Sequence, residues 1–229
     1  MDYREFRLAR IAKGTEGVRF FAFEGEVPPY MPGCFFLIRL AGNDGKPVFR
    51  PFSAASHPSE AGLQFCVKKN GAFTELLWNL REGDSAQISG PYGTFALDGN
   101  DGERVFVAGG VGIAPLRSMI RQTLLEGRRA TLFHSARTRS SMAYSEEMAQ
   151  LAAKNPGFRF FPAITREELP QGWGGMKERL TAEAVLQRLG APDGKAFYLC
   201  GTKEMVSSIA EGLMKAGVPK ERVKRESWG

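Results

Sequence analysis

The run FRPFSAAS places an arginine, an aromatic ring and a hydroxyl within four residues, at Arg50, Phe52 and Ser53. A guanidinium can hold a diphosphate through two parallel hydrogen bonds, and an aromatic face can lie against a flat ring. Taken singly, Phe52 is better explained as a core residue and Arg50 as half of a surface ion pair. The run is therefore either a simple turn or a clamp for a flat anionic cofactor, and other segments must decide between the two.

Further groups that suit an anion follow in the same half of the chain. Lys68 lies near the end of LQFCVKK, and Gly71 and Thr74 stand at the start of a helix-like segment. The first N–H groups of a helix have no partner within it and carry partial positive charge, which favours a phosphate there. Arg50 and Lys68 could therefore meet one diphosphate.

The strongest local signal is VFVAGGVGIAPLRSM, in which a strand-like run meets Gly109, Gly110 and Gly112 before Ala114 and Pro115 open a helix. Glycine lets a phosphate approach the backbone, and proline fits a first turn because its missing N–H would have no partner there. Pro115 replaces the third glycine of the usual dinucleotide fingerprint, so a standard pyrophosphate grip is not expected. A plain tight turn is the alternative, and phosphate binding is favoured over it.

A second strand-then-glycine arrangement occurs in FYLCGTKEM, at Cys200 and Gly201. Parallel strands end at the same edge of a sheet, so these residues should lie beside Gly110 if the strands are parallel. Taken alone, Cys200 is best explained as a small buried apolar residue.

The cysteines and histidines do not indicate a metal site. Cys34, Cys66 and Cys200 are far apart, and only His57 and His134 offer imidazole. An iron–sulfur cluster needs about four cysteine ligands, and a disulfide framework needs paired cysteines. We therefore predict no metal site on this chain.

The charge is unevenly distributed along the 229 residues, which carry 31 Lys and Arg against 25 Asp and Glu. Residues 1–98 hold 11 of each sign, whereas residues 99–229 hold 20 cations against 14 anions. A basic half favours an anionic partner, but no long cationic run or motif indicates nucleic acid. No signal-peptide pattern is present, and no apolar run approaches the ~20 residues that span a membrane. The cytoplasm is the expected location.

The first half has the pattern of an antiparallel β-barrel, with a sandwich as the alternative. Segments rich in Phe, Val, Ile and Leu alternate with Gly, Pro, Asn and Asp turns. The pattern predicts one helix, FTELLWNLREGD, ending at Gly83. It predicts strands at 5–13, 18–25, 34–40, 46–56, 63–69 and 86–95.

After the polar stretch Leu97–Glu103 the pattern becomes an alternation of strands and helices. Such alternation predicts a parallel sheet covered by helices, which binds ligands at the C-terminal ends of its strands. We therefore expect two domains, 1–98 and 99–229. The second has strands at 104–110, 130–136, 158–165 and 196–201, and helices at 114–127, 143–154, 181–190 and 203–217.

The order RPFS, CVKK, GAFT, GPYGTF, GGVGIAP, CG and ESW resembles that of the ferredoxin–NADP reductase superfamily along nearly the whole chain. The resemblance implies an α+β fold of two domains, with an FAD-binding Greek-key β-barrel at 1–98 and an NAD(P)-binding α/β domain at 99–229. Two departures are that Phe52 stands where many members have tyrosine, and that Cys34 follows Gly33 where members usually have glutamine.

The resemblance also implies a flavin site in the first domain, so FRPFSAAS is predicted to be the flavin clamp. Arg50 would contact the pyrophosphate, Phe52 would pack on the isoalloxazine or ribityl group, and Ser53 would hydrogen-bond the ring near N5. The other residues implied to hold FAD are Pro51, Cys66, Val67, Lys68, Gly71 and Thr74.

On the nucleotide side, the resemblance places Cys200 and Gly201 beside the nicotinamide. Ser53 and Glu226 would tune the flavin or relay a proton, and Cys200 would shape the nicotinamide pocket. Trp228 would stack on the flavin face and move for nicotinamide to enter, the alternative being a frayed chain end. The residues that would face the pyrophosphate are Gly110, Val111, Gly112 and Pro115.

Two loops bear on the choice between NADP and NAD. Thr165 and Arg166 fall where the family reads a 2′-phosphate, with Lys177 a little downstream, and the neighbouring loop HSARTR carries cations too. Such cations favour NADPH, although NAD remains possible because relatives that use NAD also carry arginines here. The residues of the second loop are Ser135, Arg137 and Arg139.

The activity that the resemblance implies is an FAD-dependent NAD(P)H oxidoreductase. Its partner would be a one-electron protein carrier such as ferredoxin, flavodoxin or an oxygenase component. One alternative is an NAD(P)H:flavin reductase that takes free flavin as substrate, although GAFT and GPYGTF favour a retained FAD. Another is a reductase or electron-transfer subunit of a multicomponent oxygenase or other complex.

Overall fold

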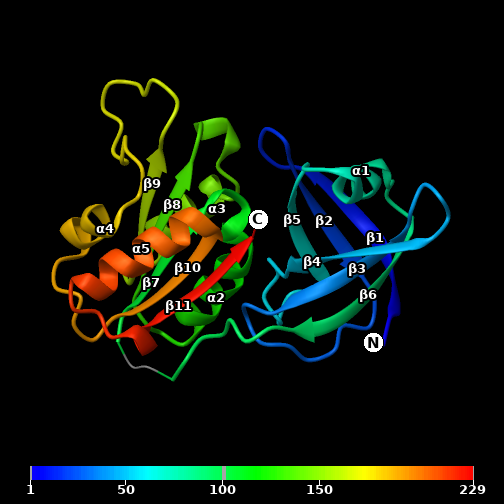
Figure 1. Cartoon of the computed structure of the whole chain (residues 1–229), viewed down its shortest axis with the longest axis horizontal. Coiled ribbons are helices and arrows are strands. Elements are labelled where there is room, and N and C mark those ends of the chain that lie inside the picture. Colours follow the sequence, from blue (N-terminus) through cyan, green and yellow to red (C-terminus); the bar gives the residue numbers. More distant parts are fainter. Residues whose placement is uncertain (1, 100–101, 229) are drawn as a thin grey trace.

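The computed structural model describes residues 2–99 and 102–228, which form two β-sheet domains side by side (Figure 1). The first is a six-stranded sheet of order β4-β3-β6-β1-β2-β5, in which every neighbouring pair is antiparallel. Its strands are β1 Arg4–Lys13, β2 Val18–Glu24, β3 Phe35–Ala41, β4 Pro47–Ser53, β5 Leu63–Lys68 and β6 Ser85–Tyr92.

This sheet encloses an apolar core, because side chains of its strands point alternately to the two faces and the inward ones are apolar. On β3, Phe36, Ile38 and Leu40 point inward and are buried. The two edge strands approach each other at an isolated antiparallel bridge between Ala54 and Phe65. The predicted antiparallel barrel is thus confirmed, and its closure lies directly after the FRPFS run.

The helix of this domain, α1, spans Ala72–Asn79 and is shorter than predicted. Leu80 already has extended backbone angles, so the predicted end at Gly83 is wrong. Gly83, with φ +100°, lies in the turn before β6, where its N–H donates to the carbonyl of Leu8 at 2.8 Å. The glycine serves a turn against β1 rather than a helix cap.

The second domain has a five-stranded sheet of order β11-β10-β7-β8-β9, and all its pairs are parallel. Helices α2 and α3 cover one face and α4 and α5 the other, each with its own apolar core (Figure 1). The bounds are β7 Arg104–Gly109, α2 Ile113–Leu125, β8 Ala130–Ala136, α3 Ser145–Lys154, β9 Phe158–Ile164, α4 Ala182–Leu189, β10 Ala196–Thr202, α5 Lys203–Lys215 and β11 Val223–Trp228.

The two domains share apolar packing across their boundary. Val18, Ala55 and Cys66 of the barrel belong to the same buried cluster as Leu116 and Met119 of α2. The segment that joins the domains is tied to the second one, since the Tyr198 hydroxyl donates to Asp98 Oδ1 at 2.9 Å. The placement of the boundary at residue 98 stays a prediction.

Candidate functional site

The FRPFS run lies where the barrel closes. Ser53 ends β4, the next residue bridges to β5, and the N–H of Ala55 donates to the carbonyl of Gln64 at 2.7 Å. This closure places Ser53 beside the strand that carries Cys66, Val67 and Lys68. The structure therefore brings together two segments that are more than ten residues apart in the sequence.

An exposed cation and an open helix start flank this closure. The Arg50 guanidinium is exposed, and within the described residues it forms no ion pair; it donates to the carbonyl of Phe49 at 2.7 Å. At the start of α1, no side chain caps the first N–H groups, and a Cβ at Gly71 would meet nothing within 4 Å. Thr74 Oγ1 accepts from the N–H of Asn70 at 2.7 Å and donates to the carbonyl of Gly71 at 2.9 Å.

Phe52 connects the strand that carries Arg50 with the helix α1. It is half-buried, with its ring stacked on that of Phe73 from α1, the centroids 5.9 Å apart, and edge-on to Phe65. Pro51 before it is also half-buried, whereas Lys68 is exposed. An exposed guanidinium, free helix N–H groups and an aromatic ring between them fit the diphosphate and flat ring of FAD. In this structure the Phe52 ring already has an aromatic partner.

The nucleotide turn lies at the C-terminal edge of the parallel sheet. β7 ends at Gly109, and a 3-10 turn over Gly110–Gly112 leads directly into α2. Gly110 has φ +54°, and a Cβ on it would meet nothing within 4 Å, so the backbone is open to a ligand there. A Cβ on the buried Gly112 would lie 2.3 Å from the Cys200 carbonyl oxygen, so that glycine allows β10 and α2 to pack closely.

The other residues implied to meet the pyrophosphate differ in exposure. Val111 is half-buried in the 3-10 turn, whereas Pro115 is buried within α2. The open backbone at Gly110 and the partly exposed Val111 are therefore accessible in this turn, whereas Pro115 is not.

A buried histidine, which the sequence did not single out, supports this turn. His134 on β8 is fully buried, and its Nε2 donates to the Gly110 carbonyl oxygen at 2.9 Å. Because a carbonyl can only accept, the neutral ring must carry its proton on Nε2. Burial lowers the pKa of His134 to about 4, and the hydrogen bond to Gly110 opposes that change only in part.

The prediction that Cys200 and Gly201 lie beside the glycine turn is confirmed. Cys200 pairs with Ala108 on β7 and with Glu226 on β11. A Cβ on Gly201 would lie 3.2 Å from the Cα of Gly109, so the two strand ends nearly touch. Burial raises the pKa of the Cys200 thiol, so the thiol is neutral at ordinary pH.

The domain boundary brings Ser53 and Glu226 together. The Ser53 hydroxyl donates to Glu226 Oε2 at 3.3 Å, across 173 residues of sequence. Burial raises the pKa of Glu226 to about 7, and the hydrogen bond from Ser53 opposes that rise only in part. The thiols of Cys34 and Cys200 both lie close enough for the charge of Glu226 to raise their pKa values further.

Residues 223–228 form a strand rather than a frayed tail. β11 runs into the boundary between the domains (Figure 1) and includes Trp228. The indole ring packs edge-on against Phe35 of the barrel, the centroids 6.4 Å apart. Trp228 also opposes part of the rise that burial causes in the pKa of Cys200. The sequence pattern does not predict this strand.

The two loops expected to read a 2′-phosphate are adjacent. The N–H of Thr165 donates to the carbonyl of Ala136 at 3.1 Å, and that of Arg166 to the carbonyl of Arg137 at 2.8 Å. Arg137 and Arg166 are exposed, and Ser135 is half-buried. Arg139 is engaged elsewhere, since its Nε lies 3.1 Å from the Glu167 carboxylate.

A barrel with an FAD-type clamp, joined to a parallel sheet with a nucleotide-type turn, defines a two-domain oxidoreductase that uses a flavin and a pyridine nucleotide. Residues 6–97 match the family model described as an oxidoreductase FAD-binding domain, and residues 106–211 match the oxidoreductase NAD-binding domain. The chain belongs to the ferredoxin–NADP reductase superfamily.

Curated and solved relatives agree with this assignment. The chain is 30% identical over 213 residues to a subunit of the Na⁺-translocating NADH-quinone reductase of Yersinia enterocolitica, covering 85% of this chain and 52% of that protein. It thus spans about half the length of the curated relatives it matches.

Among solved structures, the fold resembles the flavohaem-like FAD/NAD-binding domain of a Vibrio cholerae nitric oxide dioxygenase. The TM-score is 0.91 at 21% identity, with full coverage of both chains. It also resembles a Neisseria gonorrhoeae ferredoxin NADP⁺ reductase solved with FAD and NADP, with a TM-score of 0.86 at 20% identity over 99% of both chains. At these identities the likeness is one of fold.

Two further observations concern metals and membranes. In the ranges 2–99 and 102–228, no group of three or more His, Cys, Asp or Glu side chains could hold a metal ion. None of the helices in those ranges has both the length and the apolar character needed to cross a bilayer.

Proposed function

We propose that this chain is an FAD-dependent NAD(P)H oxidoreductase that exchanges electrons with a one-electron protein carrier, such as ferredoxin, flavodoxin or an oxygenase component. The observation that carries the proposal is the contact between Ser53 at the end of the flavin-type strand and Glu226 beside Cys200. It joins the clamp of one domain to the nucleotide edge of the other, where a flavin and a nicotinamide would have to meet.

FAD, when bound, would accept a hydride from the nicotinamide and release electrons one at a time. Arg50, Lys68 and the N–H groups at Gly71 would hold its diphosphate. Around the reacting rings, Glu226 has a pKa near neutrality and can hold or release a proton, while the Ser53 hydroxyl bonds to it. The neutral Cys200 would form one wall of the nicotinamide pocket.

Trp228 would have to change position during turnover. Its packing against Phe35 spans the boundary that a nicotinamide must enter, and its ring is only half-buried. We propose that the nucleotide displaces the indole, with the Gly110 turn holding the pyrophosphate.

We further propose NADPH as the preferred donor, with NADH as the weaker one. The adjacent Arg137 and Arg166 are exposed at the ends of β8 and β9, where they could clamp a phosphate from two sides. Because Arg139 is paired with Glu167, Arg137 and Arg166 are the cations of these loops that we propose for phosphate binding.

A cytoplasmic location is also proposed. Cys34, Cys66 and Cys200 are all unpaired. Because oxidising compartments favour disulfides, free thiols are more typical of a reducing one. Cell fractionation with an antibody against the chain would test it.

The deciding experiment is stopped-flow reduction of the purified protein by NADPH and NADH in parallel. Flavin absorbance that survives gel filtration, and that either nucleotide bleaches on the isolated chain, would support the proposal. A colourless protein that reduces added free flavin would instead identify a flavin reductase.

A coloured protein that neither nucleotide bleaches would identify a component that needs another chain. The half-length match to one subunit of an NADH-quinone reductase gives that second candidate a specific basis. The preferred carrier would then be sought by adding candidate proteins to the reduced enzyme and following reoxidation.

A further inference from the structure

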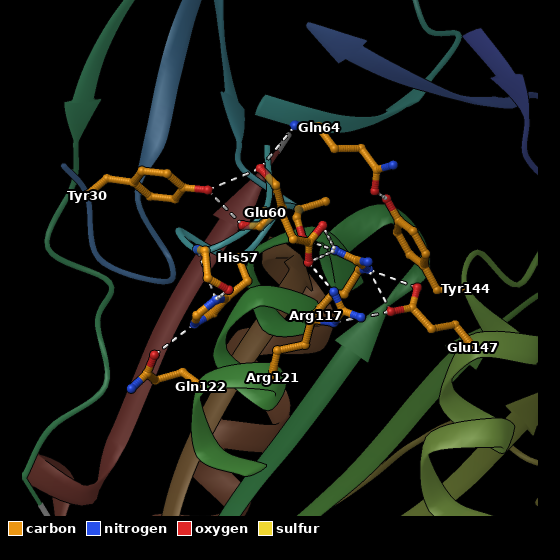
Figure 2. Close-up of polar contacts among 12 residues, drawn as sticks. Tyr30, His57, Glu60, Gln64, Arg117, Arg121, Gln122, Tyr144 and Glu147 are labelled. Atoms are coloured by element: carbon orange, nitrogen blue, oxygen red, sulfur yellow. Dashed lines mark hydrogen bonds and ion pairs between the residues drawn. The ribbon is translucent and has the colours of Figure 1, made fainter. Parts of the chain in front are cut away.

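Arg117 lies at the centre of a polar network between the domains (Figure 2). It belongs to α2, five residues after Gly112, and its side chain is only 7% exposed. Its Nη1 donates to the carbonyl of Ala55 at 2.6 Å, which lies two residues after Ser53 in the barrel. One side chain thus connects the helix that begins at the nucleotide turn with the segment that leaves the flavin clamp.

Two carboxylates from different domains neutralise this arginine. Glu60 of the barrel lies 3.2 Å from Arg117 Nη1, and Glu147 of α3 lies 2.9 Å from its Nε. Arg121, one turn further along α2, pairs with both carboxylates as well. The network therefore balances two cations with two anions, and only Glu60 belongs to the flavin-binding half.

Neighbouring contacts join the same two surfaces. His57 Nε2 lies 2.8 Å from Gln122 Oε1, and the Tyr144 hydroxyl donates to Gln64 Oε1 at 2.9 Å (Figure 2). The Tyr144 ring also lies under the Arg117 guanidinium, 5.1 Å from its Cζ. These contacts surround Arg117 along α2 and α3, so a rotation of one domain against the other would break several of them together.

Such a network fixes the relative position of the two domains more than it adds to the free energy of unfolding. Removing two charges from water costs about as much as their attraction returns, so a buried ion pair contributes little net stability. It does oppose any arrangement in which its members separate, because each would then be buried without a partner. Hydride transfer requires the reacting atoms to lie about 3–3.5 Å apart, and an error of about 1 Å is costly.

We propose that Arg117 is a positioning residue that sets the distance between the flavin and the nicotinamide through its contacts with Ala55 and Glu60. This inference rests on the proposed reductase function. Arg117 does not touch the reacting groups; it acts through the backbone of Ala55 on Ser53, and through α2 on the glycine turn.

The test compares two matched variants, Glu60→Gln and Glu147→Gln. Each replaces one negatively charged partner of Arg117 by a neutral amide of almost the same shape, but only Glu60→Gln weakens a contact between the domains. For Glu60→Gln and Arg117→Lys we expect the limiting rate of flavin reduction to fall about 10-fold, with nucleotide affinity changed less than about 2-fold. Glu147→Gln should keep the rate within about 2-fold of the parent chain.

A second readout needs no cofactor. In the apoprotein, Glu60→Gln should speed amide hydrogen exchange on both sides of the boundary, in residues 53–60 and 113–122, whereas Glu147→Gln should speed it only in the second domain. Arg104→Lys serves as a stability control. Arg104 is another buried arginine, 2.7 Å from Glu126 and confined to the second domain.

Equal rates in Glu60→Gln and the parent chain would overturn the inference, as would equal slowing in the two glutamine variants. A loss of thermal stability with no change in rate would show that Arg117 is only structural. If the parent chain itself is not bleached, the proposed function fails and this inference falls with it. A bleached parent with unaffected variants sinks the inference alone.

Discussion

The flavin side and the nucleotide side of this protein present their ligand groups in opposite ways. In the barrel the groups are exposed: Arg50 in the middle of β4, Lys68 at the end of β5 and Gly71 at the start of α1. In the second domain the open end of the turn at Gly110 is supported by buried residues, namely Gly112 of the same turn, His134 and Cys200. Changes on the first side should therefore alter affinity and leave folding intact, while changes on the second should alter folding and binding together.

The severest test of this contrast is Gly112→Ala. The added Cβ would lie 2.3 Å from the Cys200 carbonyl, so β10 and α2 must separate, at an expected cost of about 3 kcal/mol or more. Gly110→Ala is the control, because its Cβ meets nothing and only the positive φ is penalised, by about 1 kcal/mol. Urea unfolding and nucleotide titration of both variants measure the difference; equal losses would contradict it.

His134 sharpens the same contrast through pH. Its pKa in the folded protein, about 4, lies below the ordinary 6.5, so the unfolded chain binds this proton more readily. The contribution of the neutral His134 to the free energy of unfolding is therefore complete above pH 6.5. It is lost as the pH falls to about 4, by roughly 3 kcal/mol in all. In His134→Gln that part of the pH dependence should vanish, while the amide N–H can still donate to Gly110. Identical urea midpoints against pH in the two proteins would refute the assignment.

On the exposed side, Arg50→Met should weaken FAD retention by about 2 kcal/mol, roughly 30-fold, without lowering the melting temperature of the apoprotein. Lys46→Met is the matched control, since it removes an exposed cation from the same hairpin. Fluorescence titration of the apoproteins with FAD gives the affinities. A fall in apoprotein stability in Arg50→Met would mean that the arginine is structural.

The smallest effect is expected where the two sides meet. If Glu226 titrates near pH 7 beside Ser53, the rate of flavin reduction should change by up to about 10-fold across that pH, and Glu226→Gln should remove the change. Ser53→Ala, which removes the opposing hydrogen bond, should move the titration to higher pH. A rate profile that Glu226→Gln leaves unaltered would exclude this carboxylate from the reaction.

The parts of the fold that the sequence predicts correctly are those with a regular burial pattern. In the barrel, β3 alternates between buried and half-buried side chains, whereas β7 and β10 of the second domain are continuous buried runs. The parallel edge that joins Gly110 to Cys200 follows from strand order alone. The strand β11 escapes prediction because VKRESW is polar and never fully buried at the edge of the sheet. The predicted helix α1 is too long because a glycine near its end has the same appearance in a turn as in a cap.

The site is predictable where local motifs mark it and unpredictable where pairing is distant. Glu60, Arg117 and Glu147 are ordinary charged residues in the sequence, and nothing in their spacing shows that they meet. His134 likewise belongs to an apolar strand, and its partner is a backbone carbonyl 24 residues away. Only the three-dimensional arrangement of α2 against the barrel brings such groups together.

The buried cluster that continues from Val18, Ala55 and Cys66 into α2 bears on how this protein can be recombined. A chimaera that joins this barrel to the nucleotide-binding domain of another protein would expose apolar surface at the boundary, unless the face of α2 that packs on the barrel is transferred as well. The unit that folds cooperatively is thus the whole chain rather than either domain. Calorimetry of the intact chain should therefore record a single unfolding transition.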